Sequence, residues 1–202
     1  MKIHINADVY CGEESCGKVS CVIVDPINYE LTHFVVTESH FPLRSSELLV
    51  SIKHVVESDS EKVVLGCTPD ELADMENFVD LEFVPGETAT EGYGSEHLRM
   101  PVVLMTPVEH ENVPRGELAI HRGANVFAEN EQIGTVDEFL IKSKDDDHIT
   151  HIVLREGHFW GKKNITIPVS DIEKFDDRGI HLKLQKAEVE ELPSMKVHGW
   201  FS

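Results

Sequence analysis

Two ten-residue segments carry histidines at corresponding places and could supply metal ligands or catalytic bases. The segments LTHFVVTESH and ITHIVLREGH place His33 and His40 opposite His151 and His158. Each pair is an odd number of positions apart, so on one continuous strand its members face opposite sides of the sheet. A turn at Gly157 could still bring them together, but no cysteine or carboxylate stands at ligand spacing beside them. We expect no metal site and interpret the recurrence as duplication.

Other patterns that could support catalysis or ligand binding are weak. The run Lys144–Asp147 lacks the spaced carboxylates, the central glycine and the distal glutamate of a calcium-binding loop. The glycines at 92 and 94 follow no strand pattern and precede no helix pattern, so they do not form a phosphate-binding loop. The chain has no Gly-x-Ser-x-Gly, His-Glu-x-x-His or Walker sequence. We expect no catalytic residue, no cofactor and no enzymatic activity.

The chain repeats itself, and such a repeat bears on the fold more than any single motif does. When the sequence is aligned with itself at an offset of 117, residues 7–19 (ADVYCGEESCGKV) match residues 124–136 (ANVFAENEQIGTV). The two histidine segments follow at an offset of 118, after which LLVSIKHVV corresponds to ITIPVSDIE at 117 again. Two copies of roughly eighty residues are therefore predicted.

The four cysteines all lie in the first copy and form no C-x-x-C pair, which argues for reduced thiols and against a zinc site. Small or apolar residues stand at three of these positions in the second copy. Burial without reactivity is therefore predicted for Cys11, Cys16 and Cys67. Cys21 corresponds to Glu138, so exposure is expected, but no neighbouring cation favours a reactive thiolate.

Each copy has the alternation of antiparallel β-structure with one buried face. In the second copy, apolar and polar residues alternate on both sides of a turn at residues 176–179. Pro168 indicates an edge strand or a bulge. The predicted core is Ile165, Ile167, Val169, Ile180, Leu182 and Leu184, with Val50, Ile52, Val63, Leu65 and Cys67 as counterparts in the first copy.

A short helix is predicted at the end of each copy. Thr68, Pro69 and Glu71 have the order of an N-cap, a first helical residue and a capping-box partner. The run KAEVEELP should form the matching helix and end before Pro193. Short strands followed by a helix favour a barrel, because closure removes exposed strand edges. The predicted fold class is all-β, with two tandem, partly open β-barrels that each end in a short helix and are related by a pseudo-twofold axis.

These residues resemble the PRC-barrel domain family, which includes the cytoplasmic domain of the photosynthetic reaction-centre H subunit and the C-terminal domain of a ribosome-maturation factor. The second copy carries the resemblance in GANVFAENEQIGTVDEFLI and ITHIVLREGHFWGKKNITIPVSDI. The first copy departs from it, with Ser51 in place of Pro168 and SHFPLRSSEL in place of GHFWGKKN. The resemblance implies tandem adaptor modules rather than enzymes, and no residue role carries over.

The repeat divides the chain into a first barrel at residues 1–82, a connector at 83–117, a second barrel at 118–195 and a tail at 196–202. The connector contains four prolines and four glycines. Its MPVVLM segment is too apolar to favour water, so we expect it to pack on a barrel or between the barrels. A fully disordered linker is the alternative.

The charge of the chain bears on its partners. A formal net charge of -19 and a pI near 4.9 disfavour nucleic acid, which binds through lysine and arginine. Residues 1–82 hold 5 basic and 16 acidic side chains, a net charge of -11, which suggests a basic partner, although an acidic face that only aids solubility explains it too. No apolar run is long enough to cross a bilayer, so we expect a cytoplasmic protein, either a pseudo-twofold monomer or a homodimer.

The segment GHFWGKKN holds the residues predicted to dock a protein partner, namely Phe159, Trp160, Lys162 and Lys163. An aromatic pair beside two lysines has the composition of an interface anchor. Alternatively, Phe159 closes the end of its barrel and Trp160 covers the connector or the other barrel. The predicted function is a non-catalytic protein-binding or assembly adaptor. The alternative is a small-molecule or metal-binding regulatory protein that uses histidines at the junction of the barrels.

Overall fold

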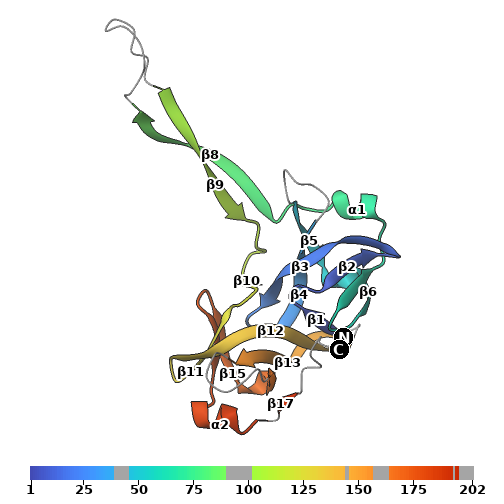
Figure 1. The fold of residues 1–202 in the computed structure, drawn as a ribbon, viewed down its shortest axis with the longest axis vertical. Helices are drawn as coiled ribbons and strands as arrows, with labels where there is room; N and C mark the ends of the chain where they lie inside the picture. Colours follow the sequence, from blue (N-terminus) through green and yellow to red (C-terminus); the bar gives the residue numbers. More distant parts are fainter. Residues whose placement is uncertain (39–45, 90–101, 144–145, 157–163, 193, 196–202) are drawn as a thin grey trace, which may run out of the picture.

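The computed structural model describes residues 1–38, 46–89, 102–143, 146–156, 164–192 and 194–195 (Figure 1). The elements of the first half are β1 (Lys2–His4), β2 (Asp8–Cys11), β3 (Glu14–Asp25), β4 (Glu30–Thr37), β5 (Glu47–Ser51), the 3₁₀ turn η1 (Ile52–His54), β6 (Val55–Ser58), β7 (Lys62–Leu65) and α1 (Pro69–Ala73). Two strands follow, β8 (Val79–Ala89) and β9 (Val102–Glu111).

The elements of the second half are β10 (Leu118–His121), β11 (Asn125–Ala128), β12 (Glu131–Ser143), β13 (Asp146–Glu156), β14 (Asn164–Pro168), η2 (Val169–Asp171), β15 (Ile172–Asp176), β16 (Gly179–Leu182), α2 (Lys186–Glu190) and β17 (Ser194–Met195). The prediction of an all-β fold with short helices is confirmed. Within the described chain, neither α-helix has the length and apolar character needed to cross a membrane.

The two halves share one pattern of strand pairing. In the first half, β2, β3, β4 and β5 pair antiparallel in sequence order, and β7 joins β2 in parallel. In the second half, β11, β12, β13 and β14 pair in the same order, and β16 joins β11 in parallel. The registers also correspond at an offset of 117 residues, since Val9 lies opposite Val63 and Val126 lies opposite Ile180. The repeat seen in the sequence is thus a repeat of topology.

Interruptions of the pairing recur at the same places in both halves. The register between β3 and β4 skips Ser20, and the register between β12 and β13 skips Asp137, which is 117 residues further on. A bulge of this kind bends the strand and gives one side chain a direction outside the regular alternation. The bulge in β12 places Asp137 at the junction of the two halves.

The first strand of each half pairs with the sheet of the other half. Strand β1 lies antiparallel to β12, with Ile3 opposite Phe139. Strand β10 lies antiparallel to β3, with Ile120 opposite Val22. Ile3 and Ile120 are again 117 residues apart, so the exchange is reciprocal. Each half therefore depends on the other to complete its sheet, and the two barrels form an interlocked body (Figure 1).

The core of this body is continuous across both halves. One buried cluster includes Ile3 and Phe34 from the first half together with Phe139 and Ile152 from the second. Most of the predicted core is buried as expected, namely Ile165, Ile167, Ile180, Leu182, Val50, Ile52, Val63 and Leu65. The remaining three, Val169, Leu184 and Cys67, pack against the cluster but are only partly buried. They lie just beyond the ends of strands, where the alternation no longer holds.

The end of the first barrel has the predicted helix cap. The Glu71 N–H donates to the Thr68 hydroxyl at 3.3 Å, and the Thr68 N–H donates to the Glu71 carboxylate at 2.8 Å. Proline at the first helical position fits this start, because its missing N–H would have had no helical partner. The helix is short and ends at Ala73.

Strands β8 and β9 form a separate two-stranded sheet that projects far from the barrels (Figure 1). This hairpin, here called the arm, takes up much of the predicted connector. Its register runs from Val79 opposite Glu111 to Ala89 opposite Val102. The expected packing of the MPVVLM segment is absent at Met105, whose side chain is 53% exposed.

Candidate protein-binding surface

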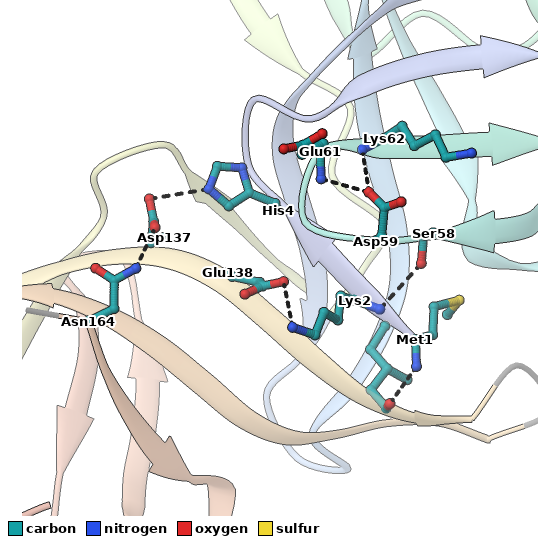
Figure 2. Close-up of polar contacts among 11 residues, drawn as sticks. Met1, Lys2, His4, Ser58, Asp59, Glu61, Lys62, Asp137, Glu138 and Asn164 are labelled. Atoms are coloured by element: carbon teal, nitrogen blue, oxygen red, sulfur yellow. Dashed lines mark hydrogen bonds and ion pairs between the residues drawn. The ribbon is translucent and has the colours of Figure 1, made fainter. Parts of the chain in front are cut away.

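A polar cluster lies where the exchanged strand β1 meets β12 (Figure 2). The Asp137 carboxylate lies 3.5 Å from the His4 ring, accepts a hydrogen bond from Asn164 at 3.4 Å and forms an ion pair with Arg155. Burial would raise the pKa of Asp137, but the hydrogen bond from His4 and the charge of Arg155 outweigh burial and lower it. Asp137 is therefore a structural anion that joins the halves, rather than a free base.

The neighbouring carboxylate has the opposite character. Glu138 is buried, and burial raises its pKa above the ordinary value, against the weaker attraction of Lys2. The Lys2 ammonium lies 3.9 Å from Glu138 Oε1, and that oxygen accepts no hydrogen bond from the described residues. Figure 2 shows the Lys2 side chain reaching toward it from β1. Ionisation of this buried carboxyl group therefore lowers the stability of the folded protein.

Four histidines at the junction form ion-pair contacts with carboxylates of other segments. The pairs are His4 with Asp137, His33 with Glu117 at 3.8 Å, His121 with Glu111 at 3.2 Å and His148 with Glu30 at 3.4 Å. Within the part of the chain that the structure describes, no three potential metal ligands come together. His151 lies 3.1 Å from the Thr150 hydroxyl, while His40 and His158 fall outside the described residues. His4, His33, His121 and His148 thus connect separate segments of the fold.

Three thiols of the first barrel, those of Cys11, Cys16 and Cys67, lie close enough together to interact. Cys11 and Cys16 are buried and Cys67 is partly exposed. Burial, followed by interaction with the Cys16 and Cys67 thiols, raises the pKa of Cys11, and burial also raises that of Cys67. The expectation of an exposed Cys21 is wrong, because His121 of the exchanged strand β10 lies opposite it and the side chain is buried in a small cluster with Phe78. Neutral thiols of this kind are poor nucleophiles.

Sequence alternation also missed a buried histidine in the second barrel. The alternation Ile180, His181, Leu182 indicates that His181 faces solvent, but β11 and β15 flank β16, and the ring is buried and stacks on Phe127 with centroids 4.9 Å apart. Its Nε2 lies 3.0 Å from Asp176, which also binds Lys174, and that lysine is the main reason why the pKa of Asp176 falls. The two rings line a cleft of about 530 Å³ that also includes Glu129, Asn130, Glu173, Leu182, Lys183 and Leu184.

The arm presents an apolar face that no described residue covers. Residues that share a face of a two-stranded sheet alternate along each strand, and the register of β8 and β9 places five apolar residues on the same side. This apolar face consists of Leu81, Phe83, Pro85, Met105 and Pro107. Among its large side chains, Leu81 is 49% exposed, Phe83 is 57% exposed and Met105 is 53% exposed. Clustered exposure of this kind makes the apolar face a candidate interaction surface.

The base of the arm is fixed to the first barrel. Phe78 precedes β8, is buried against Cys21 and Val35, and donates its N–H to the Glu47 carbonyl at 2.7 Å. Asn112 follows β9 and donates its N–H to the Phe78 carbonyl at 2.7 Å. Its side chain also donates to Asp80 at 3.0 Å. The arm thus leaves the body in a defined direction, which suits a docking element better than a flexible tether.

The residues predicted to dock a partner, Phe159, Trp160, Lys162 and Lys163, lie outside the described residues. Their role stays a prediction. The arm was not predicted from the sequence, because the prolines and glycines of residues 83–117 favoured a connector over strands. The available signal was the spacing of Leu81, Phe83 and Pro85, which alternate with Asp80, Glu82 and Val84.

Comparison with protein families finds a match to one segment of the chain. Residues 121–189 match the family model described as the PRC-barrel domain. This range begins at the end of β10 and contains β11 to β16 and most of α2, so it covers the second barrel. No curated protein matches the chain. The second barrel is therefore similar in sequence to PRC-barrel domains.

Proposed function

We propose that this protein is a non-catalytic protein-binding or assembly module in which two interlocked barrels carry a projecting docking arm. The observation that carries the proposal is the exposed apolar face of the arm. A lone two-stranded hairpin is at best marginally stable in water, so an arm that exposes Leu81, Phe83 and Met105 would gain stability from a partner that covers them. The PRC-barrel match at residues 121–189 is consistent with a binding role.

The proposal includes a PRC-barrel identity for the first half as well. Support comes from the shared strand order and from the registers that correspond at an offset of 117 residues. Because β1 and β10 are exchanged within one chain, each barrel is completed without a second copy, which favours a monomer. A cytoplasmic location, favoured by the free thiols, also stays a prediction.

The non-catalytic part of the proposal rests on how the reactive groups are engaged. Asp137 and Asp176 are held by cationic side chains, and three of the four thiols are buried. The competing hypothesis of a metal-binding regulator is tested by titration with zinc or nickel while the melting temperature is followed. We expect no saturable binding and no stabilisation, whereas a stoichiometric rise in Tm would favour the metal-binding alternative.

The binding role is tested by quantitative affinity purification from native lysate. Wild-type protein is compared with Phe83→Ser, which alters the apolar face, and with Ile27→Ser, which alters an apolar residue that is 81% exposed on a turn of the first barrel. We expect a partner that Phe83→Ser loses and that Ile27→Ser retains. Equal retention by all three proteins would place the docking surface elsewhere, and the absence of any enriched protein would contradict the proposed function.

A further inference from the structure

The carboxylates of strands β8 and β9 have no lysine or arginine beside them within these two strands. Asp80 and Glu82 lie on the face opposite the apolar one, while Glu109 and Glu111 share the apolar face near the base of the arm. His110 lies 3.1 Å from Glu82 and does not approach the apolar face. A partner that covers Leu81 and Phe83 therefore meets carboxylates at the border of the contact.

These charges disfavour a second copy of the chain as the occupant. The protein has a net charge of -19, and its acidic arm would meet another acidic surface in a self-association. Juxtaposition of like charges lowers both the affinity and the association rate, while opposite charges raise them. Charge complementarity therefore favours a basic partner.

The prolines of the arm distinguish between two modes of docking. Each strand contains one proline in its interior, Pro85 in β8 and Pro107 in β9. A strand can contain a proline where the backbone N–H would point away from the neighbouring strand. At the outer edge of the arm, such a proline leaves out a hydrogen-bond donor that an added strand would need. The edges of the arm are thus poorly suited to strand addition. The face, which carries Phe83 and Met105, is the surface left for a partner.

We infer that the apolar face of the arm docks a basic protein segment in which lysine or arginine residues are interspersed with apolar side chains. The apolar side chains cover Leu81, Phe83 and Met105, and a cationic side chain pairs with Glu109, since Glu111 is already paired with His121. This inference rests on the proposed binding function and specifies the chemistry of the partner. It assigns the docking contact to the face of the arm rather than to its edges.

The test uses three synthetic peptides and the full-length chain in a calorimetric titration. One peptide alternates lysine with leucine, the second replaces lysine with glutamate, and the third replaces leucine with serine. We expect the lysine–leucine peptide to bind at least about tenfold more tightly than the other two, because both burial and charge pairing contribute. Phe83→Ser and Leu81→Ser should each weaken its binding by roughly tenfold or more. Ile27→Ser should leave it unchanged.

Charge reversal provides an independent variant that spares the apolar side chains. Glu109→Lys lies on the apolar face opposite Leu81. This variant should weaken binding of the lysine–leucine peptide and strengthen binding of the glutamate–leucine peptide. The Tm of each variant is measured alongside, so that loss of binding is not confused with loss of folding.

Several results would overturn the inference. Equal affinity for the lysine–leucine and glutamate–leucine peptides would show that charge does not select the partner. Equal affinity for the lysine–leucine and lysine–serine peptides would show that the apolar side chains do not contribute to binding. A dimer of the free protein that Phe83→Ser abolishes would make a second copy the occupant, and Phe83-dependent binding to phosphatidylcholine vesicles would make it a lipid surface. If Phe83-dependent capture of a protein persists while the peptides fail, the binding function stands and the basic chemistry is wrong.

Discussion

The barrels and the arm are built from strands with the same alternation of apolar and polar side chains, but they differ in what covers the apolar side. In the barrels, Phe139 and Ile3 are fully buried because β1 pairs with β12 and both side chains lie in the shared core. In the arm, Phe83 is 57% exposed. An apolar face on a strand indicates that something covers it, without specifying whether the cover lies in the same chain.

The largest expected effect compares the same residue type in both regions. Phe139→Ala should lower the free energy of unfolding by about 3 to 5 kcal/mol, because it leaves a cavity in the core. Phe83→Ala should change it by less than about 0.5 kcal/mol, because its side chain is already half in water. Urea unfolding of the two variants measures both values. A loss of more than about 2 kcal/mol for Phe83→Ala would show that the arm packs on the body.

The sequence predicted the barrels well because their signals are local and duplicated. The matching runs at an offset of 117 residues located the strands, and the Thr68 cap located a helix. The exchange of β1 and β10 was not predictable, although Ile3 and His4 correspond to Ile120 and His121. The same alternation is satisfied whether a strand pairs within its own half or with the other half, so only tertiary structure decides between them.

The errors have the same origin. Cys21 corresponds to a glutamate and was expected in water, but β10 covers it. Its counterpart Glu138 is buried for the equivalent reason, beneath β1. His181 lies between two neighbouring strands and stacks on Phe127. In each case a strand distant in sequence buried a side chain that local alternation assigned to solvent.

The strand exchange is tested by a symmetric pair of small truncations. Ile3→Val and Ile120→Val should each cost about 0.5 to 1.5 kcal/mol, because both side chains are buried at equivalent places. Ile27→Val on the exposed turn is the matched control and should have no measurable effect. Denaturant unfolding is again suitable. A strong effect at Ile120 and none at Ile3 would indicate that β1 is not an integral part of the second barrel.

The buried carboxyl at the junction predicts a pH-dependent effect. The pKa of Glu138 is raised in the folded protein, so folding favours the protonated carboxyl group. The folded state is therefore most stable below the ordinary pKa of 4.5, and it loses stability as the pH rises through the folded pKa. Glu138→Gln stays neutral, so it should melt a few degrees higher than wild type at about pH 8, with the difference fading toward about pH 4. Glu173→Gln, at an exposed position, is the control. A lower Tm for Glu138→Gln at about pH 8 would mean that the ion pair with Lys2 outweighs burial.

The smallest effect concerns thiol accessibility and leaves stability unchanged. In folded protein, iodoacetamide should modify Cys67 first, because Cys11, Cys16 and Cys21 are buried. Peptide mass spectrometry after timed labelling identifies the modified residue. Labelling of Cys21 as fast as that of Cys67 would show that β10 does not remain paired with β3.

Amide hydrogen exchange tests the central claim, that the arm docks a protein, most directly. The full chain is measured alone and in complex with the partner captured in a Phe83-dependent manner. In the free chain, amides of β8 and β9 should exchange much faster than those of β3 and β12, because an isolated hairpin opens readily. In the complex, the account predicts strong new protection along β8 and β9 with little change in the barrels. Protection confined to the barrels, with an arm that exchanges as before, would contradict it.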